Sequence, residues 1–185
     1  MVINGLPAHV LIVHAVVVLV PLAALMAVLG AVWPAARRRL AYLTPLVALA
    51  ALISVPLATQ AGEWLEEHVP ESPLVEQHAG EGDAVLAWVV GLFVVACAVW
   101  LVGAVADRGR VGRTPDGDRS GVGGDQPAGA ASWAGASWAR ALVAVVTLVV
   151  AAGATLAVYR AGDSGARAAW QDQVSTAGED GGGDD

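Results

Sequence analysis

Residues 5–25, GLPAHVLIVHAVVVLVPLAAL, form an apolar stretch that nonetheless contains two histidines, His9 and His14. The apolar run continues to Trp33 without a charged residue. A helix crosses the hydrocarbon core of a bilayer in about 20 residues, so this stretch is long enough to span a membrane. It lacks the basic start of a signal peptide, and its apolar part is too long for one. We therefore expect it to be retained as a span.

Three further apolar runs resemble the first in length and contain no charged residue. The four runs cover about 8–33, 40–60, 84–105 and 141–159. Backbone groups in lipid must be satisfied within the spanning structure, and no alternating barrel pattern is present, so the spans are expected to be helices. The sequence thus predicts an all-α fold, a four-helix transmembrane bundle in a membrane domain covering residues 1–170.

The composition agrees with a membrane protein whose main partner is the lipid bilayer. Hydrophobic residues make up 56% of the 185 residues and charged residues only 15%, whereas soluble domains average about 25% charged. Acidic residues outnumber basic ones, 17 to 10, which argues against a nucleic-acid partner. Cys97 is the one cysteine, which excludes an internal disulfide.

The placement of arginine predicts the orientation of the bundle. Arg37, Arg38 and Arg39 follow the first span, and most other arginines follow the third, whereas the loop at 61–83 holds seven acids and no arginine. Because basic loops stay in the cytoplasm, we expect a multi-pass protein of the cell membrane with both termini outside. Residues 106–138 are typical of a flexible cytoplasmic linker, and 171–185 of a disordered acidic tail. No internal repeat is evident.

In this orientation all four histidines lie at the outer membrane boundary. His9 and His14 open the first span, and His68 and His78 belong to the outer loop, with Glu63 just past the end of the second span. His68 is expected to be a solvated loop residue. The convergence of imidazoles on one layer is the main functional signal in the chain.

His14 lies deepest, about 9 Å below the start of the first span at 1.5 Å per residue. Ionisable side chains within a span usually face the bundle interior. His14 and Pro21 are seven residues apart and share a face, so we expect them to form the bundle-facing stripe. His9 lies about 140° away around the helix, and it is either a ligand or an interfacial residue.

Two cofactor hypotheses follow from these residues. Imidazoles on facing helices of a bundle hold heme b, and His14 with His78 is the favoured pair, with His9 as a further cofactor-binding candidate. Alternatively, His14, His78 and Glu63 form a site for a zinc, iron or copper ion. Either would suit electron transfer with a redox partner at the outer face.

A non-catalytic alternative stays open, in which the protein is a membrane scaffold or accessory subunit and its histidines only form hydrogen bonds between helices. No nucleophile–base pair is evident, so an enzyme acting alone is not favoured. Ala23, Ala27 and Ala31 form a small-residue stripe that suits either a homo-dimer or packing within one bundle.

The opening stretch resembles the start of the DUF2231 family of uncharacterised bacterial integral membrane proteins. That family typically opens with a Gly-x-Pro-x-His-Pro-x-x-Val-His-Phe-Pro pattern, and the chain matches it at Gly5, Pro7, His9, Val13 and His14. Weaker matches are ATQAGEWLEEHV, VEQHAGEGD and YRAGDSGARAAW. The resemblance implies a four-helix membrane protein with suspected heme or redox association. The chain departs from the pattern at Val10, Ala15 and Val16.

Overall fold

The apolar stretches form four long α-helices in the computed structural model, which describes residues 2–3, 6–68, 72–111 and 130–179, with side chains at 8–68, 72–104 and 138–170. These helices are α1 (Ala8–Val32), α3 (Leu43–Glu66), α4 (Pro73–Val111) and α5 (Ala130–Glu179). A short helix, α2 (Pro34–Leu40), joins α1 to α3, and the two-residue strands β1 (Val2–Ile3) and β2 (Leu6–Pro7) pair antiparallel before α1. The predicted all-helical fold with four long apolar helices is confirmed.

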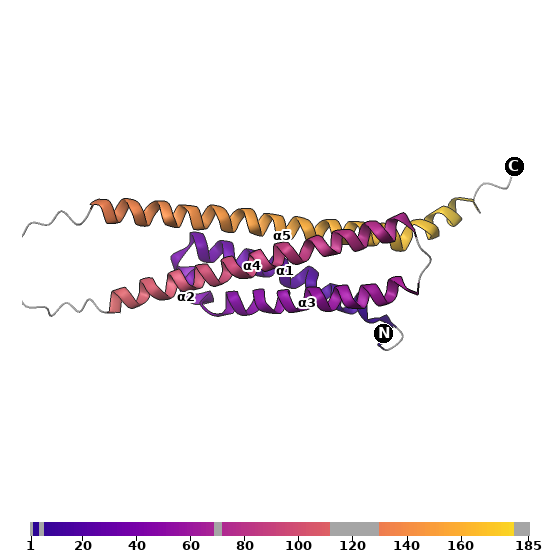
Figure 1. Ribbon diagram of the computed structural model, residues 1–185, viewed down its shortest axis with the longest axis horizontal. Helices are drawn as coiled ribbons and strands as arrows, with labels where there is room; N and C mark the ends of the chain where they lie inside the picture. Colours follow the sequence, from indigo (N-terminus) through magenta and orange to yellow (C-terminus); the bar gives the residue numbers. More distant parts are fainter. Residues whose placement is uncertain (1, 4–5, 69–71, 112–129, 180–185) are drawn as a thin grey trace, which may run out of the picture.

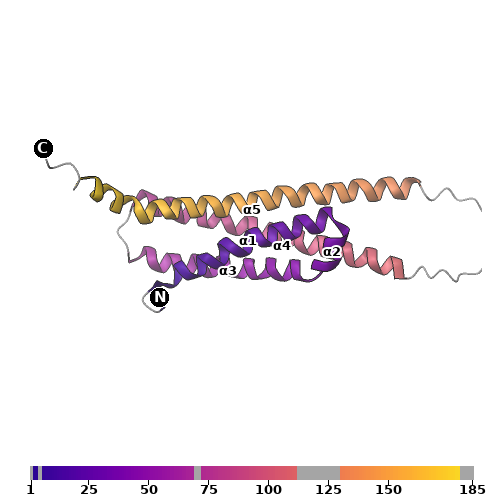
Figure 2. The same ribbon diagram turned by 180° about the vertical axis from the view of Figure 1, so that it is seen from behind.

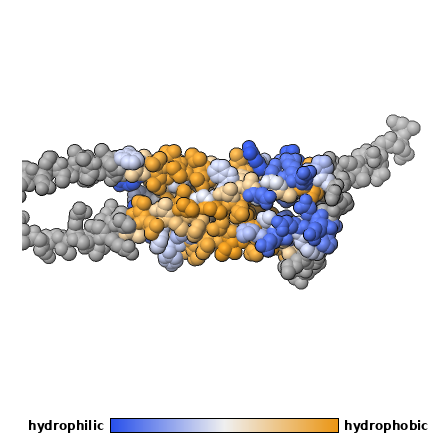
Figure 3. All heavy atoms as spheres, viewed as in Figure 1, coloured by the Kyte–Doolittle hydropathy of each residue, from blue (hydrophilic) through white to orange (hydrophobic). Residues whose placement is uncertain are grey.

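Each of the four long helices is long and apolar enough to cross a membrane. Large apolar side chains remain exposed all along the bundle, among them Val18, Leu25, Val94, Trp100, Val145 and Val149. Figure 3 shows apolar residues covering the middle of the face in view, with hydrophilic residues gathered at the right-hand end. A soluble monomer rarely exposes an apolar surface of this extent, so the molecule is a multi-pass membrane protein by class.

The helices alternate in direction, so that α1 and α4 begin, and α3 and α5 end, at the same end of the bundle (Figures 1 and 2). We call this the histidine end, because His9, His68 and His78 lie there. The opposite end carries Arg37, Arg38 and Arg39 on α2, and Arg140 near the start of the fourth span. We call it the arginine end.

The core consists of small and β-branched residues that recur along each helix in steps of three and four. On α1 the buried seam is Val16, Val20, Ala23 and Ala27. This spacing is the knobs-into-holes pattern of helical bundles. Because Ala23 and Ala27 are fully buried inside the bundle, the alanine stripe serves internal packing.

The same residue types recur on equivalent helices, which reveals an internal repeat that sequence inspection missed. The pairs in α1 and α4 are His9 with His78, Val16 with Val85, Val20 with Val89, and Ala27 with Ala96. The pairs in α3 and α5 are Thr44 with Thr147, Ala48 with Ala151, Ala51 with Ala154, Val55 with Val158, Ala58 with Ala161, and Gly62 with Gly165. Each set keeps one constant spacing. The bundle is therefore two equivalent hairpins, α1–α3 and α4–α5.

The packing of the helices follows this repeat. α1 packs against α3 and α5, and α4 packs against the same two helices, while α1 and α4 contact each other less extensively. The two hairpins run in the same direction (Figure 1). Residues at equivalent positions on α1 and α4 are thus brought face to face across the middle of the bundle.

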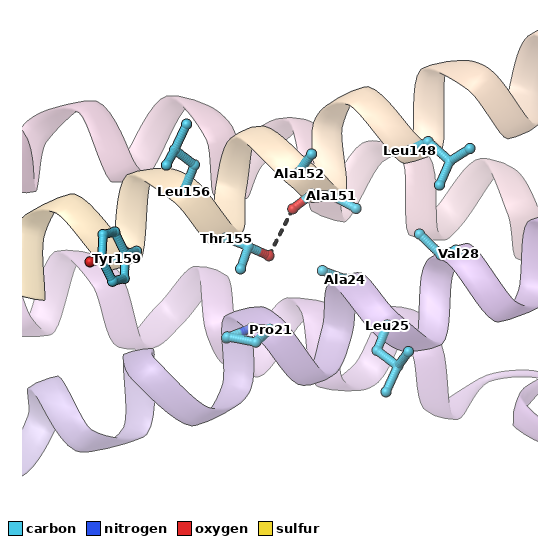
Figure 4. A pocket seen from close by; sticks show the side chains of 10 residues that line it. All are labelled: Pro21, Ala24, Leu25, Val28, Leu148, Ala151, Ala152, Thr155, Leu156 and Tyr159. Carbon is cyan, nitrogen blue, oxygen red and sulfur yellow. Dashed lines mark hydrogen bonds between the residues drawn. The ribbon is translucent and has the colours of Figure 1, made fainter.

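The repeat is broken at one apolar groove of about 620 Å³ between α1 and α5. Ala24 and Thr155 line it (Figure 4), and the Thr155 hydroxyl donates to the Ala151 carbonyl at 2.8 Å. The equivalent positions on α4 and α3 carry Phe93 and Leu52, which pack against the core. Ala24 and Thr155 are smaller than Phe93 and Leu52, and the space that they do not fill forms the groove. No histidine or carboxylate lines it.

The helices extend further than the predicted spans. α4 begins at Pro73 because Ser72 caps it, with its hydroxyl accepting from the Val75 amide at 3.3 Å and proline in the first turn. Residues 106–111 and 130–138 of the predicted linker, and 171–179 of the predicted tail, are helical. The remainder of both segments, 112–129 and 180–185, lies outside the described residues.

Candidate functional site

Two histidines from the two hairpins meet at the histidine end of the bundle. His9 lies in the first turn of α1 and His78 in the second turn of α4. Their ring centroids are 6.0 Å apart and their planes are nearly perpendicular, at 84°. Both side chains are half-buried. The structure therefore pairs His9 with His78, which occupy equivalent positions in the repeat.

The ring of His9 is held by α3. Its Nδ1 lies 2.9 Å from the carbonyl oxygen of Ala58. One turn further on is Gly62, where a Cβ atom would lie only 3.1 Å from Cε1 and Nδ1 of His9. The glycine thus gives the ring room to lie against the α3 backbone.

The ring of His78 is held by α5 in the same manner. Its Nδ1 lies 3.3 Å from the Ser164 hydroxyl, which donates to the Ala161 carbonyl at 3.2 Å. A Cβ atom at Gly165 would lie 2.8 Å from Cε1 of His78, closer than real contacts allow. Alanine and glycine four residues apart therefore form the seat of each ring, at Ala58 and Gly62 and again at Ala161 and Gly165.

These hydrogen bonds indicate that Nδ1 of each ring carries a proton. A carbonyl oxygen only accepts, so Nδ1 of His9 carries the proton. The single proton of Ser164 is given to Ala161, so the hydroxyl accepts from Nδ1 of His78. A ring whose single proton sits on Nδ1 keeps the lone pair of Nε2. Metal-binding histidines are commonly oriented by such a bond from the other ring nitrogen.

His14 does not face the bundle interior, and the prediction that it does was wrong. Its side chain is exposed, and Nδ1 donates to the Val10 carbonyl of its own helix at 2.6 Å. The buried face of α1 is instead the seam that contains Val16 and Val20, and His9 lies on the continuation of that seam. His14 shares a face with Pro21, which is only half-buried. That face was wrongly predicted to be the one that packs inside the bundle.

The predicted ion site of His14, His78 and Glu63 is not assembled either. Glu63 is exposed on α3. Within the described residues no three histidine, cysteine or carboxylate side chains lie close enough together to hold a metal ion. His68 is exposed as expected and stacks on Trp64. Its Nδ1 bonds the Trp64 carbonyl at 2.7 Å.

Glu81, one of the seven acids of residues 61–83, is a neighbour of the site. It lies one turn after His78 on α4 and is half-buried. One carboxylate oxygen accepts from the Gln77 amide at 3.0 Å, and the other is buried without a hydrogen-bond partner among the described residues. Asp163, also at this end, instead pairs with Arg167 on the surface at 2.6 Å.

The seat of the rings predicts a contrast between two glycines of α5. Gly165→Ala is expected to push the His78 ring from Ser164 and to lower the free energy of unfolding by about 1–3 kcal/mol, as overpacking does. Gly162 has nothing within 4 Å, so Gly162→Ala is expected to stabilise the helix by up to about 1 kcal/mol. Thermal unfolding in detergent, followed by circular dichroism, measures both. Equal shifts of the same sign would contradict the proposed seat.

The fold and the site define an all-helical membrane bundle with a histidine pair between two equivalent hairpins. Comparison of the chain with protein-family models, with curated proteins and with solved structures finds no match. The resemblance of residues 5–16 to the DUF2231 opening stays a prediction.

Proposed function

We propose that the protein binds a b-type heme between His9 and His78 at the outer face of the membrane and serves electron transfer. The observation that carries this proposal is the pair of imidazoles from α1 and α4, with ring centroids 6.0 Å apart and each Nδ1 held by another helix. A bis-histidine heme needs two such donors from facing helices of a bundle.

The spacing of the rings suits this ligation. A metal ion held by two imidazole nitrogens at about 2 Å each would need the two rings within a few ångströms of one another. The observed centroid separation is 6.0 Å. A small ion such as zinc takes four ligands in a structural site and three in a catalytic one. The described residues offer only two histidines here, which favours heme over a small ion.

In this account the residues of the chain hold and orient the ligands. His9 and His78 would supply the nitrogens that hold the heme, Ala58 and Ser164 orient their rings, and Gly62 and Gly165 provide the space for the rings. The heme, when bound, supplies one-electron chemistry. A redox partner would approach at the hydrophilic end of the bundle (Figure 3).

The proposal is tested by the absorbance spectrum of the detergent-purified protein, oxidised and then reduced with dithionite, before and after heme is added. We expect a sharp reduced α-band that saturates at one heme per chain. A protein that stays colourless after heme addition would remove the heme function and leave the second candidate.

The second candidate is a membrane scaffold in which the same histidines only clamp helices together. The specific observation in its favour is that each ring already bonds a neighbouring helix, His9 to Ala58 and His78 to Ser164. Interhelical bonds of this kind contribute about 0.6–2 kcal/mol in membranes. In this case His9→Ala lowers the melting temperature of a protein that never takes up heme.

The orientation belongs to the same proposal: the histidine end and both termini outside, and the arginine end in the cytoplasm. The arginines of α2, which has no acid, support it. In a Cys97→Ala background, we expect Glu67→Cys to react with a membrane-impermeant maleimide on intact cells. Arg39→Cys is expected to react only after permeabilisation. Both positions are exposed, and the reverse pattern would overturn the orientation.

A further inference from the structure

The arginine end contains a half-buried arginine, Arg37, whose side chain packs against α4. Arg37 of α2 extends over α4, where a Cβ atom at Gly103 would lie 2.9 Å from its Cδ and 3.0 Å from its Nε. Nε of Arg37 is buried and has no hydrogen-bond partner among the described residues. A buried donor without an acceptor costs free energy, more so when it belongs to a charged group.

A small cavity lies beside this group. It has a volume of about 90 Å³ and is lined by two arginines, Arg37 and Arg140, and by five apolar residues: Ala31, Val99, Val102, Ala139 and Val143. The lining comes from α1, α2, α4 and α5. The volume equals about three waters of the liquid, each of about 30 Å³, so the cavity accepts a group of a few atoms and not a hydrocarbon chain.

The chemistry of the lining selects an anion with an apolar continuation. Guanidinium groups bind phosphate oxygens through charge-assisted hydrogen bonds. The cavity lies where α1 ends and the fourth span begins, and lipid headgroups are found at the ends of spanning helices. The five apolar residues of its lining suit the carbon atoms next to the phosphate. Arg38 and Arg39, exposed on the same helix, add positive charge nearby.

We propose that this cavity binds the phosphate of an anionic phospholipid, with Arg37 as its ligand and Arg140 lining the cavity beside it. Basic pockets between membrane helices are known to hold anionic headgroups. The bound lipid would give the buried Nε its acceptor and would tie α2 to α4 and α5. This site is independent of the histidine pair at the opposite end.

The test is native mass spectrometry of the detergent-purified full chain with added phosphatidylglycerol, and with phosphatidylcholine as the neutral lipid. We expect one phosphatidylglycerol per chain to be retained in preference to phosphatidylcholine. Arg37→Gln is expected to weaken its retention about tenfold, as loss of a charged hydrogen bond predicts. The matched control is Arg39→Gln on the same helix, which is expected to bind as the wild type does.

A second variant and a competing anion complete the test. If Arg37→Gln does not fold, Arg37→Lys keeps the charge but lacks Nε, and it is expected to lose the preference as well. Inorganic phosphate is added as a competitor. Its failure to displace the lipid supports a lipid site, whereas displacement at equal concentration overturns it. Equal retention of both lipids, or unchanged binding by a folded Arg37 variant, would overturn the proposal.

Discussion

His9→Ala and His78→Ala are each expected to abolish the reduced α-band of low-spin heme. Each variant removes one axial nitrogen of the proposed pair and leaves the other ring in place. Loss of an outer-shell partner alone typically weakens metal binding about 10–100-fold, so loss of a ligand is expected to exceed about 100-fold. Heme titration followed by absorbance measures the affinity of each variant.

His14→Ala and His68→Ala are the matched controls, because both side chains are exposed and bond only their own helix. Both are expected to bind heme as the wild type does. Loss of the α-band in His14→Ala with retention in His9→Ala would return the site to the pair that the sequence favoured.

Gly153→Ala is expected to cause the largest loss of stability of any glycine substitution in the described bundle. A Cβ atom there would lie far inside contact distance of three ring carbons of Trp88. The indole must leave its place against α5, so we expect the free energy of unfolding to fall by about 3 kcal/mol, the upper range of overpacking. Thermal unfolding in detergent measures this loss.

A double-mutant cycle identifies the cause of that loss. Trp88→Ala removes the ring, and in its background Gly153→Ala is expected to cost almost nothing. Gly80→Ala, on the same helix as Trp88 with nothing within 4 Å, is the control. A full loss of stability that persists without the Trp88 ring would show that the ring contact is not responsible.

The fold could be predicted because the bilayer constrains it strongly. Long uncharged runs such as 84–105 can only be helices in lipid. The helix ends were harder, because the extension of α4 to Pro73 depends on a local cap at Ser72, outside the apolar run. The short helix α2 contains three arginines and carries no hydropathy signal.

The sequence predicted that all four histidines converge on one layer, with His14 and His78 as the favoured pair. The structure brings together His9 and His78, both of which were candidates, whereas His14 and His68 are exposed. The sequence predicted the wrong buried face of α1 because His14 is the ionisable residue deepest in the span. The alanines and valines of the buried seam differ little from the other apolar residues of the helix. The seam from His9 through Val16, Val20 and Ala23 follows steps of seven, four and three, and its repetition on α4 was the signal available.

The glycine seats could not be predicted without the partner helices. Gly62 and Gly165 are ordinary helix residues in the sequence, and their role depends on a ring from another helix. Each follows an alanine by four residues, in ATQAG and AGDSG. That short motif becomes informative only once the two hairpins are superimposed.

The most direct test of the central claim, that His9 and His78 face each other as a ligand pair, is the electron paramagnetic resonance spectrum of the ferric heme-loaded protein. Nearly perpendicular axial imidazole planes, as in the 84° arrangement of these rings, produce a strongly anisotropic low-spin signal. The account predicts this signal in the wild type and its conversion to a high-spin signal in His9→Ala. A high-spin wild-type spectrum, or a low-spin signal unchanged in His9→Ala, would contradict it.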